Sequence, residues 1–232
     1  EAMHSREHVE YNEMLDRAGL PASQLDKFLW GFLAFIKKSL GKRLTLAATI
    51  ALEHYTALMA DQLLRNPDVL GEKSEPAYKQ MWMWHAYEET EHKAVAYDVW
   101  NHVLPDNMHN RFTRRLAMVL ATAIFWPLVA YFHMRLVFAD KTIQGGHLKG
   151  FWTVTKMLWG KKVGVLRNPV ANGEFLDYFK ADFHPWMHDN SRFLTEIDNF
   201  VASVEGSGRK PNTEIANAIR ARMNSQLKAN AA

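Results

Sequence analysis

Residues 84–100 read WHAYEETEHKAVAYDVW, and this stretch decides the fold class because its polar and apolar residues repeat with the period of an α-helix. His85, Glu89 and His92 are spaced i, i+4 and i+7, which places them on one helix face within about 60° of arc. Apolar side chains continue this face in both directions. Imidazoles and carboxylates are tolerated inside an apolar face when they are paired or bind a metal ion, so the stretch predicts a buried polar site.

The rest of the chain continues the helical pattern. Gly and Pro are scarce and fall between long helical runs, while the alternation typical of strands is nearly absent. The pattern therefore predicts an all-α protein. Helices are expected at residues 1–18, 22–40, 42–65, 74–105 and 115–140, with shorter ones near 149–160, 172–183 and 191–204. We expect residues 1–140 to form the metal-binding bundle and residues 141–232 a helical appendage with a polar tail, in the same domain.

The composition limits the chemistry that the chain can carry. Its 232 residues are 48% hydrophobic and 23% charged, which excludes a disordered or low-complexity protein. The formal charge is only +3 and no run of five basic residues occurs, so no nucleic-acid partner is expected. The chain has no cysteine. Disulfides, thiolate zinc sites, iron–sulfur clusters and cysteine nucleophiles are thereby excluded, and any metal must be held by nitrogen and oxygen atoms.

Two further segments carry candidate ligands. Glu53 is the only acidic residue in 42–60, and its helix face is otherwise small and apolar. A carboxylate in that setting needs a partner, which leaves a metal ion, a hydroxyl group and an arginine as the open alternatives. Glu1 and His4 have the i, i+3 spacing that brings two side chains onto one helix face, close enough to bind the same ion.

Together these positions match part of a known ligand arrangement. Di-iron and di-manganese carboxylate bundles use two helices with Glu-x-x-His and two helices with a single Glu. Three of those four helices can be assigned in this chain. The opening EAMHSREHVEYNEML has the pattern of the middle of a helix, so we expect the fourth helix, with one more Glu, upstream of residue 1.

Four motifs resemble a bacterial family named predicted metal-dependent hydrolase, a ferritin-like group. They are EAMHSREHVEYN at 1–12, ALEHYTA at 51–57, WHAYEETEHKAVAYDVW at 84–100 and DFHPW at 182–186. The resemblance covers nearly the whole chain and implies a ferritin-like bundle. The His-x3-Glu-x2-His pattern is also similar to that of di-iron arylamine N-oxygenases, in which the first histidine is an additional iron ligand. That resemblance implies six metal ligands, with Glu1 and Glu89 bridging two ions: Glu1, His4, Glu53, His85, Glu89 and His92.

The function expected from this ligand set is that of an enzyme with a dinuclear non-haem metal site. Six ligands with three histidines favour two iron ions, with manganese as the alternative, over zinc, which prefers four ligands. Such a site suits O2-dependent oxidation of a small apolar substrate. Two alternatives stay open: a metal-dependent hydrolase, as the family name implies, and a non-catalytic helical protein that binds a membrane or a partner.

Residues 116–132, LAMVLATAIFWPLVAYF, contain 17 residues without a charge. A membrane-spanning helix needs about 20 apolar residues, so this segment is at the lower limit. Two interpretations stay open. The segment is either a helix kinked at Pro127 that is buried or lies at a homo-oligomer interface, or a helix that contacts a membrane surface. In each case we expect its apolar surface to be covered by a second chain, by lipid or by residues 145–205. The absence of a signal peptide at residue 1 predicts a cytoplasmic protein, with membrane association as the open question.

Three other polar residues lie in or near these motifs. His54 follows Glu53 directly and faces about 100° away from it on a helix, which disfavours it as a ligand. Asp98 is a candidate for orienting a ligand. His184 has no role that the pattern indicates.

Overall fold

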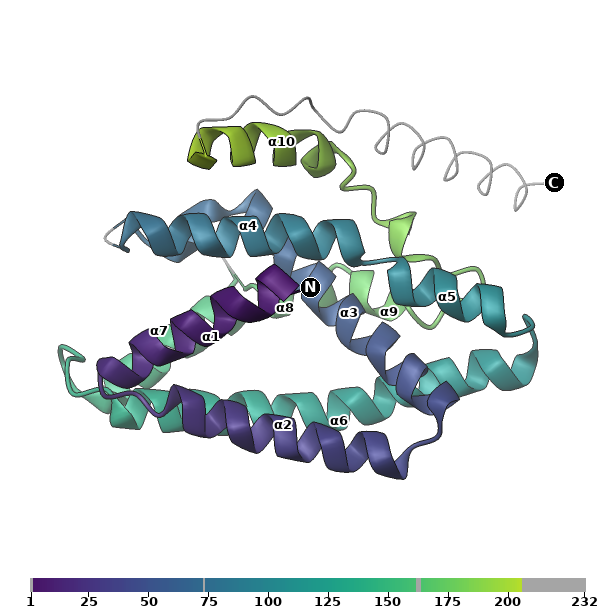
Figure 1. Ribbon diagram of the computed structural model, residues 1–232, viewed down its shortest axis with the longest axis horizontal. Helices are drawn as coiled ribbons and strands as arrows, with labels where there is room; N and C mark the ends of the chain where they lie inside the picture. The colour runs from purple at the N-terminus through teal and green to yellow at the C-terminus, as the bar shows by residue number, and fades with distance from the viewer. Residues whose placement is uncertain (1, 73, 162–163, 206–232) are drawn as a thin grey trace. The chain divides into compact units, whose positions relative to one another are not determined.

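Helices account for every regular element in the part of the chain that the computed structural model describes, residues 2–72, 74–161 and 164–205 without the side chains of 2–7, 198 and 201–205 (Figure 1). The all-α prediction is confirmed for these residues. The long helices are α1 (Ala2–Arg17), α2 (Ala22–Ser39), α3 (Lys42–Arg65), α4 (Pro76–His92), α6 (Met108–Ala139), α7 (His147–Trp159) and α10 (Arg192–Glu205). The short elements are η1 (Pro67–Leu70), α5 (Val95–Val103), α8 (Arg167–Ala171), α9 (Glu174–Asp177) and η2 (Pro185–Met187).

The chain divides into two compact units. The first unit runs up to Ala51 and from Met108 to Gly164, and the second contains Leu52–Asn107 and the chain from Val165 onward. The first unit therefore contains α1, α2, α6, α7 and the beginning of α3, and the second contains the rest of α3 and the remaining helices. The expected division into residues 1–140 and 141–232 stays a prediction.

The turn between α1 and α2 is set by local chemistry. Gly19 has φ 86°, a left-handed conformation that favours glycine because it has no Cβ. The carboxylate of Asp16 accepts a hydrogen bond from the backbone N–H of Ser23, at 3.1 Å, in the first turn of α2. Hydrogen bonds from Ser23 lower the pKa of Asp16, as expected for a carboxylate at the positive end of a helix dipole.

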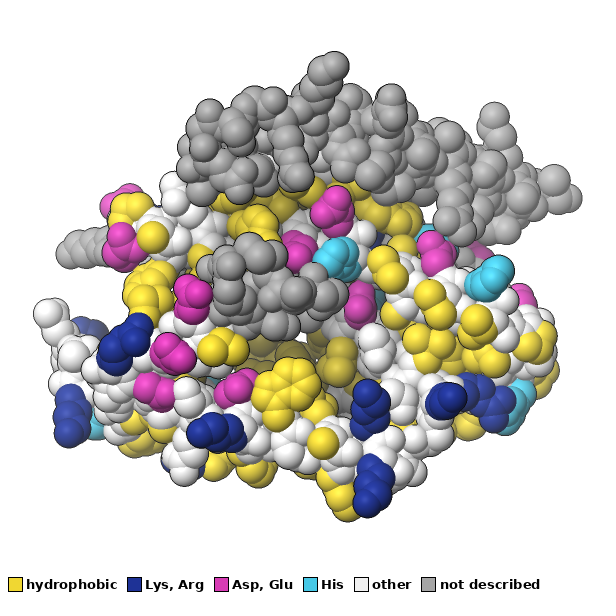
Figure 2. Space-filling view, viewed as in Figure 1, with side chains coloured by type: hydrophobic (Ala, Val, Ile, Leu, Met, Phe, Trp, Pro, Cys, Tyr) yellow, Lys and Arg dark blue, Asp and Glu magenta, His cyan; other side chains and the backbone are white. Residues whose placement is uncertain are grey.

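Aromatic rings join α2 to α6 in the first unit. The ring of Phe28 lies 5.9 Å from that of Tyr131 and 6.3 Å from that of Phe132. The guanidinium group of Arg135 donates a hydrogen bond to Gln24 Oε1 at 3.1 Å. Figure 2 shows hydrophobic side chains, in yellow, left on the surface along α2 at the bottom of the view. The packing between α2 and α6 therefore covers only part of their apolar surface.

Rings also join α7 to α6. Trp126 and Trp159 have ring centroids 4.8 Å apart, and the His133 ring stacks on that of Phe151 at 4.7 Å. Helix α6 continues through Pro127, the position at which a kink was expected. Proline has no N–H to donate to the preceding turn, but here it lies within a single 32-residue helix that contacts its neighbours on both sides of the proline.

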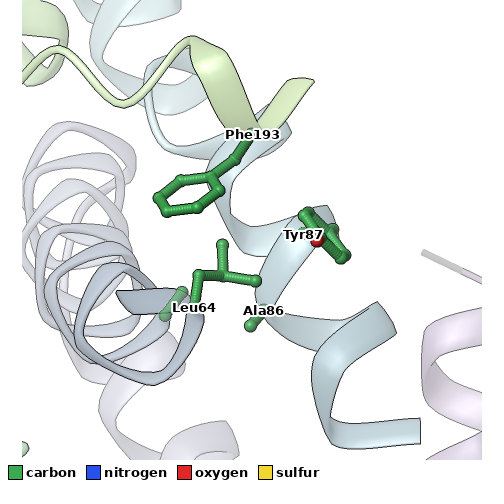
Figure 3. Packing of buried hydrophobic residues seen from close by; sticks show 5 residues of the cluster. Leu64, Ala86, Tyr87 and Phe193 are labelled. Carbon is green, nitrogen blue, oxygen red and sulfur yellow. The ribbon is translucent and has the colours of Figure 1, made fainter. Parts of the chain in front are cut away.

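The core of the second unit forms where three helices meet. Ala60 and Leu64 of α3 pack against Ala86 and Tyr87 of α4, and Phe193 of α10 closes the cluster (Figure 3). The alanines let the helix backbones approach closely, and the larger side chains fill the space between them. This packing fixes the C-terminal half of α3 against α4, the two helices that carry four of the predicted ligands.

Three helix predictions are wrong in extent. The helix expected over 115–140 begins earlier, at Met108. The helix expected over 74–105 is interrupted at Lys93–Ala94, between α4 and α5. Lys93 is buried there and its ammonium group binds residues near 190, a contact that the local pattern does not contain. The helix expected over 172–183 is reduced to α9, residues 174–177, followed by turns, and Gly173, with φ 83°, separates it from α8. The expected polar tail, residues 206–232, lies outside the described residues.

Replacement of Phe193 by alanine tests the importance of the second-unit core. Phe193 is 4% exposed, so Phe193→Ala leaves a cavity and should lower the free energy of unfolding by about 3–5 kcal/mol. The matched variant Phe35→Ala removes the same side chain from a position that is 69% exposed. It should change the free energy of unfolding by no more than about 0.5 kcal/mol. Urea unfolding followed by circular dichroism measures both, and equal losses would contradict this description of the core.

Candidate metal centre

Three of the six predicted ligands lie on α4, and two of them face one another. His85 Nε2 and Glu89 Oε1 are 3.7 Å apart, with side chains that are 19% and 14% exposed. Two donor atoms that each bind one ion at about 2.0–2.2 Å lie about 3–4 Å from each other, so this separation is compatible with a shared ion. His92 is the last residue of α4 and is half-buried. The i, i+4 spacing therefore places the side chains of His85 and Glu89 next to each other, as the sequence pattern predicts.

The surroundings of this pair favour ion binding. The Trp82 ring meets the His85 imidazole edge to face, with centroids 5.6 Å apart. The Nδ1 atom of His85 is buried. An aromatic neighbour and partial burial lower the local dielectric constant, which strengthens the attraction between a carboxylate and a cation.

Glu53 lies on the part of α3 that belongs to the second unit. Its residue is half-buried, and its Oε2 atom is fully shielded from solvent. The hydroxyl group of Thr56 donates a hydrogen bond to the backbone oxygen of Glu53 at 3.1 Å, as serine and threonine often do within helices. A carboxylate oxygen buried in this way meets the condition expected of a ligand.

The complete set of six ligands stays a prediction. Among the side chains that the structure describes, no three His, Asp or Glu residues lie close enough together to hold one ion. Glu1 lies outside the described residues, and His4 lies on α1 at a position whose side chain is not described. The described part of the chain therefore contributes one facing pair and two further candidate ligands from the same compact unit.

Residues that the sequence pattern did not assign join two of the motifs. His184 Nδ1 accepts a hydrogen bond from the backbone N–H of Trp186 at 3.2 Å, so the proton lies on Nε2 and is donated to Asp98 Oδ1 at 3.1 Å. The Tyr97 hydroxyl group donates to the backbone oxygen of Phe183. Asp98, a candidate for orienting a ligand, thus orients His184. The turn at 183–186 is held against α5 by these bonds.

His54 also contacts this turn. It is 4% exposed, and its ring lies 5.2 Å from that of Tyr178 and 5.3 Å from that of Phe183, in the second case edge to face. Residues of the motifs at 51–57, 84–100 and 182–186 therefore meet in one place within the second unit. This contact explains why a histidine occupies an apolar helix face at position 54.

A polar pocket of about 200 Å³ lies in the second unit next to these residues. Its lining is His54, Ala57, Leu58, Asp61, Arg65, Lys93, Glu174, His188 and Asp189. Asp61 accepts a hydrogen bond from Arg65 at 2.6 Å, which raises the pKa of the guanidinium group. His188 Nε2 lies 2.9 Å from Asp177 Oδ2. Helix spacing places the α3 residues of this lining on one face, but no spacing in the sequence links them to the other residues, which come from three separate segments.

Burial shifts two pKa values in this pocket. Burial raises the pKa of the Glu174 carboxyl group. Lys93 is 4% exposed, and burial lowers the pKa of its ammonium group to about 7. Its Nζ atom donates to the backbone oxygen of His188 at 2.8 Å and to Asn190 Oδ1 at 2.6 Å, and it lies 3.9 Å from the centre of the Trp186 ring. Lys93 therefore ties the chain at 186–190 to the end of α4.

The pKa of Lys93 predicts how stability depends on pH. Between about pH 7 and pH 10, Lys93 is neutral in the folded protein but still protonated in the unfolded chain. Because the unfolded state binds more protons, stability rises with pH in this interval. Compared with Lys93→Met in the presence of EDTA, the wild type should gain up to about 1.4 kcal/mol per pH unit in the free energy of unfolding. Parallel pH profiles from urea unfolding would contradict the lowered pKa.

Comparison with models of protein families gives a match. A family model described as "Predicted metal-dependent hydrolase" matches residues 1–189. The matched range includes all six predicted ligands and the turn at 183–186. Comparison with curated proteins found no match, and comparison with solved structures found none either.

Proposed function

Because the chain belongs to the predicted metal-dependent hydrolase family, we propose that it is a hydrolase whose metal site is centred on His85 and Glu89 of α4. The observation that carries the proposal is the 3.7 Å separation of two partly buried donor atoms, one nitrogen and one oxygen. Membership of the family implies divalent metal ions. The two donors are of the types that bind such ions in proteins without cysteine.

We propose that the ions are held in a ferritin-like arrangement by Glu1, His4, Glu53, His85, Glu89 and His92. Two divalent ions need several carboxylates to offset their charge, and the three glutamates of this set supply them. The buried oxygen of Glu53 and the partly buried Glu89 support their inclusion. A donor set of nitrogen and oxygen atoms favours iron, with manganese as the alternative.

A bound divalent ion would polarise the scissile group of the substrate and lower the pKa of a water molecule. The chain prepares the site for this chemistry in two ways. For His85 Nε2, the atom facing Glu89, to bind an ion, the proton of the imidazole must lie on Nδ1, the buried nitrogen. The Trp82 ring covers the imidazole and excludes water from that side. The proposed substrate contacts the open side of the α4 pair.

O2-dependent oxidation of a small apolar substrate at a di-iron site is the second candidate function. It is favoured by one observation, the arrangement of His85, Glu89 and His92 on a single helix, which is similar to the ligand pattern of di-iron N-oxygenases. The two functions differ in what they consume. Anaerobic loading with Fe(II), followed by exposure to O2, should change the optical spectrum only if the site activates O2.

Substitution of Glu89 separates a ligand from a bystander on the same helix. Glu89→Gln keeps the size of the side chain but removes its charge, and it should lower metal affinity at least about tenfold and abolish metal-dependent hydrolysis. The matched control is Glu91→Gln, which changes an exposed residue of α4 in the same way. This variant should retain metal affinity and metal-dependent hydrolysis. Metal content by mass spectrometry and hydrolysis of a panel of nitrophenyl esters and phosphate esters provide the two measurements.

The same experiment distinguishes the two candidate functions. Equal metal content in the two variants would contradict the role of Glu89 as a ligand. If the wild type binds metal through Glu89 and consumes O2, but hydrolyses no ester with any divalent ion, the oxidation reaction replaces hydrolysis as the proposed function.

A further inference from the structure

Charge is distributed unevenly along the chain. Residues 22–51 and 108–161 contain 13 lysines and arginines but only two acidic residues, Asp26 and Asp140. Their net charge is +11, and because the whole chain carries +3, the remaining residues carry −8. The basic segments contain α2, α6, α7 and the beginning of α3, and all of their residues belong to the first unit.

The same unit exposes an apolar helix. Helix α6 contains an 18-residue window with a mean hydropathy of 1.7, long and apolar enough to cross a membrane, yet only 11% of that window is buried. The core helix of a soluble protein with this composition is mostly buried. Large exposed side chains run along the helix: Phe112, Leu116, Val119, Leu120, Ile124, Met134 and Phe138.

The two helices that flank α6 extend this surface. On α2, Trp30 is 66% exposed and Phe35 is 69% exposed, and on α7, Leu148 is 71% exposed and Trp152 is 53% exposed. Exposed lysines lie among them, including Lys37. Figure 2 shows such basic side chains, in dark blue, beside hydrophobic ones along α2. Exposed tryptophans together with lysines and arginines are typical of surfaces that lie at a membrane interface.

We propose that the exposed faces of α2, α6 and α7, the lipid-docking surface, bind an anionic lipid bilayer. The apolar side chains enter the boundary between headgroups and acyl chains, and the lysines and arginines contact the lipid phosphates. The surface lies on the bilayer and does not span it. Helix α6 is held to α2 through Phe28 and to α7 through Trp159, and a spanning helix would have to lose these contacts.

Charge favours lipid over a second copy of the chain. Two copies that joined through this surface would bring two segments of +11 together, and like charges across an interface oppose association. An anionic bilayer presents the opposite sign. Each lysine or arginine near such a surface strengthens binding about fivefold. The inference does not depend on the metal site, whose proposed ligands other than Glu1 and His4 belong to the second unit.

Flotation of the full chain with two kinds of vesicle tests the proposal. One kind contains phosphatidylcholine alone, and the other also contains about 30% phosphatidylglycerol, which adds negative charge. We expect binding at least about tenfold stronger to the anionic vesicles, with most of this preference lost in about 0.5 M NaCl because salt screens the attraction. Equal binding to both vesicles, or no binding to either, would overturn the proposal.

A matched pair of variants locates the surface. Lys37→Gln with Lys38→Gln removes two exposed charges from α2 and should weaken binding to anionic vesicles about 30-fold. Lys79→Gln with Arg192→Gln removes two charges from the second unit and should change binding to anionic vesicles less than about twofold. Equal effects of the two pairs would overturn the assignment to the first unit. If circular dichroism shows that the α2 variant is unfolded, the salt dependence of wild-type binding tests the proposal in its place. A dimer that forms without vesicles in sedimentation would overturn the proposal and assign this surface to a second copy of the chain.

Discussion

The second unit depends on the contacts of one buried side-chain nitrogen, Nζ of Lys93. It is buried at the break between α4 and α5, where it binds the backbone oxygen of His188, the side chain of Asn190 and the face of the Trp186 ring. A buried cation is costly because it loses its hydrating water, and these three partners replace that water only in part, since burial still lowers the pKa of Lys93 to about 7. Both hydrogen bonds are made by one buried nitrogen atom, so the end of α4 and the chain at 186–190 are constrained together.

This constraint organises residues from distant parts of the chain. Because α4 ends at His92, α5 starts in a new direction, and Tyr97 and Asp98 reach the turn at 183–186. His54 of α3 packs against Phe183 of that turn. The helices that carry Glu53, His85 and Glu89 are therefore held in place by contacts that do not involve these three residues. A rigid frame of this kind keeps donor atoms in place before an ion binds.

The sequence was sufficient for features that depend on neighbouring residues. Helix α3 begins and ends at the predicted residues 42 and 65, and His85 and Glu89 face one another because i, i+4 spacing requires it. The break at Lys93 could not be predicted, because it depends on a partner at Asn190, 97 residues away. The polar pocket was missed for the same reason. The residues that complete it opposite α3, at positions 93, 174 and 188–189, have no spacing in the sequence that links them to Asp61 and Arg65.

The candidate site was predictable only in part. Helix periodicity places candidate ligands on a face, but whether Glu53 and the ligands from α1 reach the α4 pair depends on tertiary packing, which no single helix encodes. The lipid-docking surface is a similar case. The sequence singled out residues 116–132, whereas the contribution of α2 and α7 follows from their packing beside α6.

X-ray absorption spectroscopy of the metal that remains bound to the wild-type protein after gel filtration tests the proposed site most directly. If His85 and Glu89 hold the ion, the spectrum should contain nitrogen and oxygen ligands at about 2.0–2.2 Å, together with the outer-shell scattering of imidazole rings. A metal coordinated by oxygen alone, without imidazole scattering, or a folded protein that retains no metal, would contradict a metal centre on α4.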